Sequence, residues 1–214
     1  MGAAAWTPIS FREVTDGLDP RVLAAGPPPL ASWIGPGATG EWSFRVADPG
    51  CGDAELIADW MARPHVDLFW EQAWPVERWA AVLRRQLAGD CTRPLIATRA
   101  QLDLAYLEVY RTPRDVVGRH YPAEPFDLGI HLAIGPLAAT GRGVGRQLVR
   151  ALVSALFEAD AQCARIVADP DVRHAAARRM FTHAGFRLLA EVDIGHKCAA
   201  LMSCERPAFT SRVS

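Results

Sequence analysis

The order of apolar and polar positions predicts alternating strands and helices from residue 41 onward. Apolar and polar residues alternate over Trp42–Val46, as they do in a strand with one buried face. Helical spacing then covers 53–61, where Asp53 is expected to cap the helix and Pro64 to end it. Further strands are expected at 94–98, 105–110, 127–134, 165–169, 186–192 and 198–204, and further helices at about 75–89, after Gly143 and at 172–184. The predicted order is β-α-α-β-β-β-α-β-α-β-β.

Residues 1–40 have a different pattern, because prolines and glycines such as Pro27–Pro29 and Gly35–Gly37 interrupt them repeatedly. We expect this segment to be an extended arm packed on the rest of the chain. Residues 41–214 are expected to form one domain, since a chain of 214 residues that is 50% hydrophobic can bury a sizeable core.

Charge and cysteine content exclude several functional classes. A net charge of -1 and a pI near 6.6 give no basic field for nucleic acid. No apolar run is long enough for a membrane span, and the first residues lack the pattern of a secretory signal. The five cysteines have no paired spacing, which argues against disulfides and a metal knuckle. We therefore expect a cytoplasmic protein with no metal site, and the sequence leaves its oligomeric state open.

The most informative segment is the strand at 127–134, which leads into a glycine-rich turn at Gly141–Gly145 and a long amphipathic helix. Glycines let the backbone approach an anion, and the free N–H groups and dipole of a helix start favour negative charge. Glycine turns also occur for steric reasons alone. A P-loop is excluded because no Lys-Ser/Thr pair comes after Gly145, and a dinucleotide-binding fold would place this turn early in the chain.

The turn resembles the pyrophosphate motif Arg/Gln-x-x-Gly-x-Gly/Ala of the GCN5-related N-acetyltransferase (GNAT) superfamily. Gly143 and Gly145 match this motif, whereas Thr140 departs from its first position. A narrower pattern is similar to the siderophore-biosynthesis branch, which includes the mycobactin lysine N-acyltransferases and the hydroxamate-siderophore N-acetyltransferases. That pattern, within a similarity over about 41–209, consists of Tyr121, Pro125, Asp127, Gly129, His131, Val167–Asp171, Ala184–Phe186, Lys197 and Leu201.

This resemblance implies an α/β (α+β) fold of the GNAT type, with a mixed central sheet splayed between its fourth and fifth strands and helices on both faces. A splay leaves backbone groups unpaired, and in the family the thioester and pantetheine of the donor fill it. The implied donor is acetyl-coenzyme A or another acyl-coenzyme A. The residues that the resemblance places at the coenzyme are Ile134, Arg142, Gly143, Val144, Gly145, Arg146, His174 and Arg178.

His131 and Asp169 are the candidate catalytic pair. His131 shares a strand face with Asp127, and it points into the splay if Ile130 and Leu132 pack on the other face. The alternative is a core histidine bonded to a carbonyl. In the siderophore enzymes the matching pair is the proposed base, whereas Asp169 could otherwise simply cap the next helix. We expect His131 to titrate near pH 6–7 and to deprotonate the acceptor, with Asp169 orienting it or holding the acceptor.

The acceptor side is expected to be largely aromatic. The candidate substrate-binding residues are Trp70, Glu71, Trp74, Glu108, Tyr110 and Asp127. Phe181 occupies the place of a tyrosine that protonates the leaving thiolate in many acetyltransferases, and phenylalanine cannot donate a proton.

The function that these residues favour is an acyl-coenzyme A-dependent N-acyltransferase of siderophore biosynthesis. Its acceptor would be the small-molecule ω-amine or N-hydroxyamine of lysine, ornithine or a diamine. One alternative is an aminoglycoside 6′-N-acetyltransferase, for which an open cleft rich in carboxylates would be expected. Another is a non-catalytic acyl-coenzyme A sensor, which would need the phosphate cradle but no catalytic pair.

Overall fold

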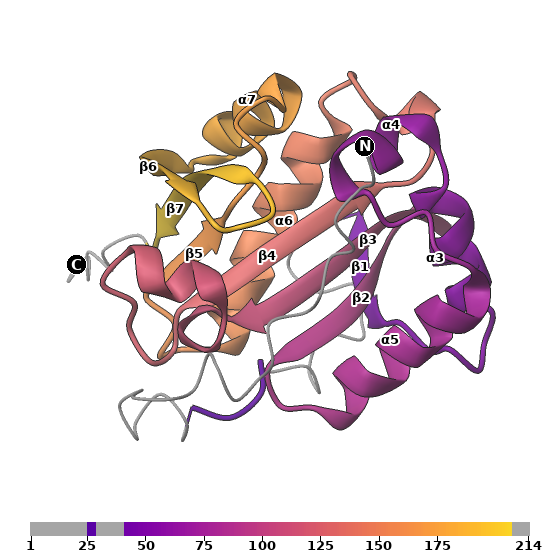
Figure 1. Ribbon diagram of the computed structural model, residues 1–214, viewed down its shortest axis with the longest axis horizontal. Helices are drawn as coiled ribbons and strands as arrows, with labels where there is room; N and C mark the ends of the chain where they lie inside the picture. The colour runs from indigo at the N-terminus through magenta and orange to yellow at the C-terminus, as the bar shows by residue number, and fades with distance from the viewer. Residues whose placement is uncertain (1–24, 29–40, 207–214) are drawn as a thin grey trace, which may run out of the picture.

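The computed structural model describes residues 25–28 and 41–206, and within them one seven-stranded sheet has the order β1-β2-β3-β4-β5-β7-β6 (Figure 1). Every neighbouring pair is antiparallel except β4 and β5, which run parallel. The strands are β1 (Trp42–Val46), β2 (Thr92–Arg99), β3 (Leu102–Arg111), β4 (Leu128–Ile134), β5 (Arg165–Ala168), β6 (Arg187–Asp193) and β7 (Cys198–Glu205). The mixed sheet expected from the sequence is therefore confirmed.

Helices cover both faces of the sheet, as expected. They are α3 (Asp53–Met61), α4 (Pro64–Trp70), α5 (Val76–Ala88), α6 (Val144–Ala159) and α7 (Ala175–Ala184), with 3-10 turns η1 (Thr112–Arg114), η2 (Val116–His120) and η3 (Leu137–Ala139). Apolar side chains of α3 and α5 pack with Tyr106 and Ala133 on one face. Those of α6 and α7 pack with Leu107 and Ile130 on the other. Successive strand residues point to opposite faces, so β2, β3 and β4 each contribute side chains to both cores.

Helix α4 was not expected from the sequence. Pro64 separates α3 from the next segment, but it also occupies the first turn of α4. A proline is tolerated there because the first helical N–H groups have no partner within the helix. The helix has only seven residues, and Glu71 ends it in a left-handed conformation with φ 52°. This short helix carries Trp70 toward the sheet.

The expectation that Asp53 caps α3 is wrong, because the cap position is Gly52 and Asp53 is the first helical residue. The buried carboxylate of Asp53 instead accepts hydrogen bonds from the guanidinium of Arg45 at 2.6 and 2.8 Å and from Asp48 N–H at 2.7 Å. A strong cationic donor on the neighbouring strand thus replaces the helix N–H groups as the partner of this carboxylate.

One part of the N-terminal arm falls within the described residues. Arg111, a buried residue at the end of β3, donates hydrogen bonds to the carbonyls of Gly26 at 3.1 Å and Pro27 at 3.2 Å. The same guanidinium pairs with Asp160 at 2.9 Å. The rest of the expected arm, including Gly35–Gly37, lies outside the described residues.

Gly129 on β4 leaves space for the ring of Tyr110 on β3 to lie over it. It pairs across strands with Tyr110, and a Cβ atom at Gly129 would clash with the Tyr110 ring. That ring is buried and lies next to His131, with 4.8 Å between the ring centroids. The absence of a side chain at 129 therefore positions Tyr110.

We expect Gly129→Ala to lower the free energy of unfolding by about 1–3 kcal/mol, the usual cost of overpacking a filled site. Urea unfolding would measure it. The matched control is the same substitution in a Tyr110→Ala background, where the ring that causes the clash is gone and the added methyl should cost much less. Equal costs in both backgrounds would contradict this role of Gly129.

Candidate active site

Strands β4 and β5 separate soon after they meet. They pair only at Leu128–Ile166 and Gly129–Val167. Gly135 N–H donates to the Leu104 carbonyl at 3.0 Å, so odd-numbered residues of β4 direct their backbone groups toward β3. The backbone groups of Leu132 and Ile134 therefore face the opposite edge, beyond the last β5 pair. This is the splay that the resemblance implied, and it leaves these peptide groups of β4 without a partner strand.

His131 stands on β4 between two carboxylates. Its Nδ1 lies 3.1 Å from Oε2 of Glu108, and its Nε2 lies 3.0 Å from Oδ1 of Asp169. The side chain is 30% exposed, so one side of the ring remains accessible. Ile130 and Leu132 pack in the core on the other face of the sheet, as expected. The alternative of a core histidine bonded to a carbonyl is not what the structure has.

Asp169 comes directly after β5 and is buried between three donors. Its Oδ1 accepts from His131 and, at 3.3 Å, from the Tyr110 hydroxyl, and its Oδ2 lies 3.0 Å from Lys197 Nζ. Asp169 does not cap the next helix, since the N-cap of α7 is His174 and no side chain caps that helix. Asp169 is therefore free to hold His131.

Glu108, an expected acceptor-side residue, is engaged by three neighbouring side chains. Its Oε1 accepts hydrogen bonds from Gln86 Nε2 at 2.7 Å and from the Tyr106 hydroxyl at 2.9 Å. Its other oxygen is directed at His131. Glu108 thus fixes the orientation of the imidazole from the side opposite Asp169.

The two carboxylates determine the charge of His131. Burial lowers the pKa of His131, but Asp169 and Glu108 outweigh burial and raise it to about 10. Burial would likewise raise the pKa of Asp169, but His131 and Lys197 hold it well below its usual range. The pKa of Glu108 is also lowered, because the bond to His131 overcomes burial. This pKa lies above the range of 6–7 that we expected, and it favours the protonated imidazole at neutral pH.

The glycine turn before α6 has an open backbone. Gly143 is the N-cap of α6, with φ 78°, and a Cβ atom there would meet nothing within 4 Å. Gly145 serves packing instead, since a Cβ atom there would lie 2.5 Å from the sulfur of Met180. Val144 packs against the core, Arg142 is exposed, and Arg146 lines a groove of about 530 Å³ between α6 and β1. This open N-terminus fits an anionic ligand.

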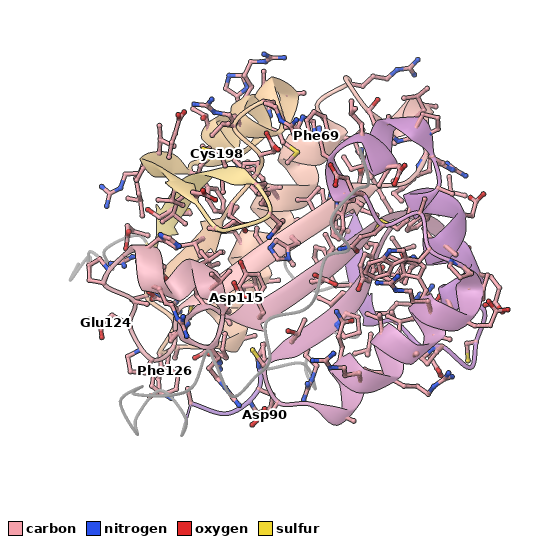
Figure 2. All side chains as sticks on the ribbon, in the orientation of Figure 1. Phe69, Asp90, Asp115, Glu124, Phe126 and Cys198 are labelled. Atoms are coloured by element: carbon pink, nitrogen blue, oxygen red, sulfur yellow. The ribbon has the colours of Figure 1, made fainter. Side chains whose placement is uncertain are left out.

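Three other expected coenzyme residues are engaged by the protein itself. The carbonyl of Ile134 lies 3.1 Å from Nε2 of His65. The ring of His174 stacks on Phe69, which projects from α4 toward α7, at 3.8 Å between centroids (Figure 2). Arg178 pairs with Glu191 at 3.1 Å. These contacts leave room for further ones, since a carbonyl oxygen has two lone pairs and a guanidinium has five N–H donors.

The expected substrate residues Trp70, Glu71 and Trp74 lie in or just after α4, whereas Asp127 lies in the loop before β4. Trp70 lies edge-on to His131, with 6.2 Å between ring centroids, and Glu71 is the next residue, at the end of α4. Trp74 packs on Trp79 at 5.3 Å.

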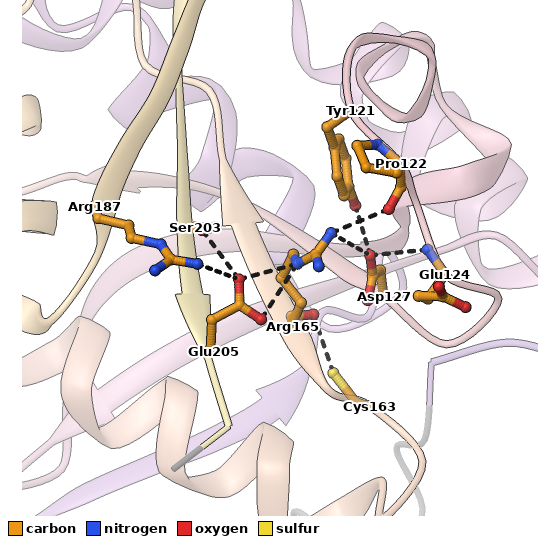
Figure 3. Close-up of polar contacts among 9 residues, drawn as sticks. All are labelled: Tyr121, Pro122, Glu124, Asp127, Cys163, Arg165, Arg187, Ser203 and Glu205. Atoms are coloured by element: carbon orange, nitrogen blue, oxygen red, sulfur yellow. Dashed lines mark hydrogen bonds and ion pairs between the residues drawn. The ribbon is translucent and has the colours of Figure 1, made fainter. Parts of the chain in front are cut away.

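Asp127 is not brought to His131. Its carboxylate accepts from the Tyr121 hydroxyl and from Glu124 N–H, both at 3.0 Å, and lies 3.6 Å from Arg165 (Figure 3). Its role is to fix the loop that leads into β4.

Sequence reasoning assigned no role to Lys197 or Gln86. Lys197 belongs to the family-like pattern, which was the one available signal for it. Gln86 is on α5 and reaches Glu108 on the sheet face that α5 covers, a contact that helical spacing does not reveal. Both residues bind the carboxylates that hold His131.

Comparisons with known proteins agree with this geometry. Residues 51–194 match the model of the family described as acetyltransferase (GNAT) domain. Lysine N-acyltransferase MbtK of Mycolicibacterium paratuberculosis is 39% identical over 88% of this chain and 82% of its own. N(6)-hydroxylysine O-acetyltransferase of Escherichia coli is 34% identical over 80% of this chain and 54% of its own. The solved structure of AAC(6′)-Ib with paromomycin and acetyl-coenzyme A is similar with a TM-score of 0.72 and 25% identity, over 81% of this chain and 98% of its own.

We expect Gly143→Asp to weaken acetyl-coenzyme A binding at least tenfold, or ~1.4 kcal/mol, because it places a negative charge at the N-terminus of α6. Gly143→Asn is the matched control, since it has nearly the same shape and the same positive-φ strain but no charge. Calorimetric titration of both variants isolates the charge. Equal affinities for the two would contradict a phosphate site at this helix start.

Proposed function

From the premise that this chain belongs to the GNAT acetyltransferase family, we propose that it acylates the ω-amine or N-hydroxyamine of lysine, ornithine or a diamine in siderophore biosynthesis. The chain is an acyl-coenzyme A-dependent N-acyltransferase. We propose the acceptor class and a cytoplasmic location. The observation that carries the acceptor class is the half-buried cluster of Glu108, His131, Asp169 and Lys197, which lies next to Trp70. The charged groups and the aromatic side chain of Trp70 lie close together, so a short linear acceptor could contact both.

The charge state of His131 governs which acceptor reacts at a given pH. An alkylamine has a pKa near 10.4 and arrives as an ammonium that is no nucleophile. His131, with a pKa of about 10, holds its own proton at neutral pH and accepts one from the acceptor only as the pH approaches that value. An N-hydroxyamine is less basic and arrives with its lone pair free. The site therefore favours N-hydroxyamines at neutral pH.

The leaving thiolate receives no proton from position 181. Phe181 is buried in the core, with its ring 5.1 Å from that of Phe186. A free thiol has a pKa of about 8.5, so departure as thiolate is tolerated, and water or another group supplies the proton afterwards.

An aminoglycoside acceptor fits this site less well, although a structural neighbour binds such compounds. A polycationic antibiotic needs several unpaired carboxylates. Here Glu108 is bound by His131, Gln86 and Tyr106, and Asp169 is bound by His131 and Lys197. Of the expected acceptor-side residues, Glu71 is the remaining exposed carboxylate.

The acceptor class is tested by measuring kcat/KM with acetyl-coenzyme A for lysine, N6-hydroxylysine, the corresponding ornithine and cadaverine pairs, kanamycin and tobramycin. At pH 7 we expect each hydroxylated acceptor to exceed its parent amine by at least about tenfold, and the ratio to fall as the pH approaches 10, where both the alkylamine and His131 lose protons. Higher kcat/KM for the aminoglycosides would overturn the proposal.

At a pH near 10, where His131 can accept a proton, His131→Asn should lower kcat with an alkylamine by about 10²–10⁴, because asparagine keeps a polar contact but cannot carry the proton. Coenzyme affinity should be nearly unchanged, since the backbone of the turn at Gly143 is untouched. His183→Asn, at an exposed position of α7, is the matched control and should keep full activity. A folded His131→Asn enzyme within threefold of wild type on every acceptor would show that His131 is structural.

A further inference from the structure

Lys197 is the only lysine in this chain, and the other 22 of its 23 basic residues are arginines. The one side-chain ammonium of the sequence lies 3.0 Å from Asp169 Oδ2, with 20% of its side chain exposed. The one lysine of the chain is thus the residue that binds the carboxylate next to His131.

The backbone holds Lys197 in register with Asp169. The residue is in the turn between β6 and β7, which the bond from Ile194 N–H to the Lys197 carbonyl closes at 3.1 Å. The segment after Asp169 is tied to β7, because Val172 N–H donates to the Cys198 carbonyl at 3.0 Å. Ala200 N–H donates to the Pro170 carbonyl at 2.8 Å on the same segment. The ammonium is thus fixed relative to the carboxylate that it binds.

We propose that Lys197 is a positioning residue: its ammonium holds Asp169 through one oxygen and keeps the other oxygen directed at His131. This inference rests on the proposed function, in which His131 and Asp169 are the catalytic pair. Lys197 also places a positive charge that opposes protonation of His131, whereas Glu108 places a negative charge that favours it. The two residues therefore act on the imidazole with opposite sign.

A lysine suits this task better than an arginine. A guanidinium presents a planar fork that binds both oxygens of a carboxylate at once. At Asp169 such a fork would compete with His131 and Tyr110 for Oδ1, to which both are bonded. An ammonium is a compact point charge that occupies Oδ2 and leaves Oδ1 available.

The charged and titratable groups around His131 come from several elements. Those that face it or its carboxylates are Tyr106, Glu108 and Tyr110 on β3, Asp115 before η2, Asp169 after β5, and His196 and Lys197 in the β6–β7 turn. Glu71, at the end of α4, acts on His196. Among the contacts of the described residues, the ammonium of Lys197 is the cation bonded to Asp169 besides His131 itself. Removal of the Lys197 charge should therefore raise the pKa of His131.

The test monitors the imidazole of His131 by NMR in protein labelled with ¹³C-histidine. Glu108→Gln removes one opposite charge and should lower the apparent pKa of His131 by about 1–3 units, into a range that is easily titrated. In that background Lys197→Met should raise the pKa again by at least about 1 unit. Lys197→Arg, which keeps the charge, is the matched control and should leave the pKa close to that of Glu108→Gln alone.

Activity provides the second measurement. In the otherwise wild-type chain, Lys197→Met and Lys197→Arg should each lower kcat by roughly 10–100-fold, as loss of an orienting partner does, with little change in coenzyme affinity. Lys197→Gln replaces Lys197→Met in both experiments if the methionine variant does not fold. An unchanged His131 pKa in the Glu108→Gln/Lys197→Met protein, or a kcat within threefold of wild type, would overturn the inference.

The NMR titration does not depend on turnover, so the two proposals fail separately. If the wild-type enzyme acylates no ω-amine or N-hydroxyamine while the opposite pKa shifts appear, the proposed acceptor class is wrong and the position of Lys197 in the cluster is upheld. If acylation occurs and the shifts do not, the proposed function stands and Lys197 is only an anchor of the turn.

Discussion

The placing of an imidazolium between two buried carboxylates is the interaction on which the rest of this structure depends. Charges removed from water are tolerated only when they are paired and their remaining hydrogen-bonding positions are filled. His131 pairs with Glu108 and Asp169, and each carboxylate then needs a further partner. Gln86 supplies it at one end and Lys197 at the other. Elements from α5 to the β6–β7 turn must therefore be in register before the site exists.

The sequence predicted the fold well where periodicity extends over enough residues. Alternation along the strands and the apolar stripe of α6 hold over several repeats, so the element order was correct apart from one short helix. Helix α4 spans barely two turns, too short for a periodic signal, and Pro64 was interpreted only as an end. Asp53 was misassigned because a capping residue and a strand-facing ion-pair partner look identical in sequence. Local pattern does not reveal a partner from another element.

The sequence predicted the central pair of the site, His131 and Asp169, but not the residues that hold this pair in place. His131 and Asp169 were identified through the resemblance, and their contact is confirmed. Asp127 shares a strand face with His131, yet four residues of strand separate them by roughly 13 Å. A shared face was therefore insufficient to bring the two side chains together. The pKa of His131 could not be predicted from its type, because both dominant charges come from other strands.

Strand β4 connects the two halves of the reaction. Its odd-numbered side chains, including His131, face the side covered by α3 and α5, and its even-numbered side chains, including Ile130, face the core under α6. Its unpaired edge at Leu132 and Ile134 leads toward the glycine turn that opens α6. On the proposed function, coenzyme recognition at Gly143 would rely on backbone geometry and so tolerate Thr140 in the motif, whereas acceptor chemistry would rely on side-chain charges that tolerate little change. The same strand could then keep one donor geometry while the charges around His131 determine which amine is acylated.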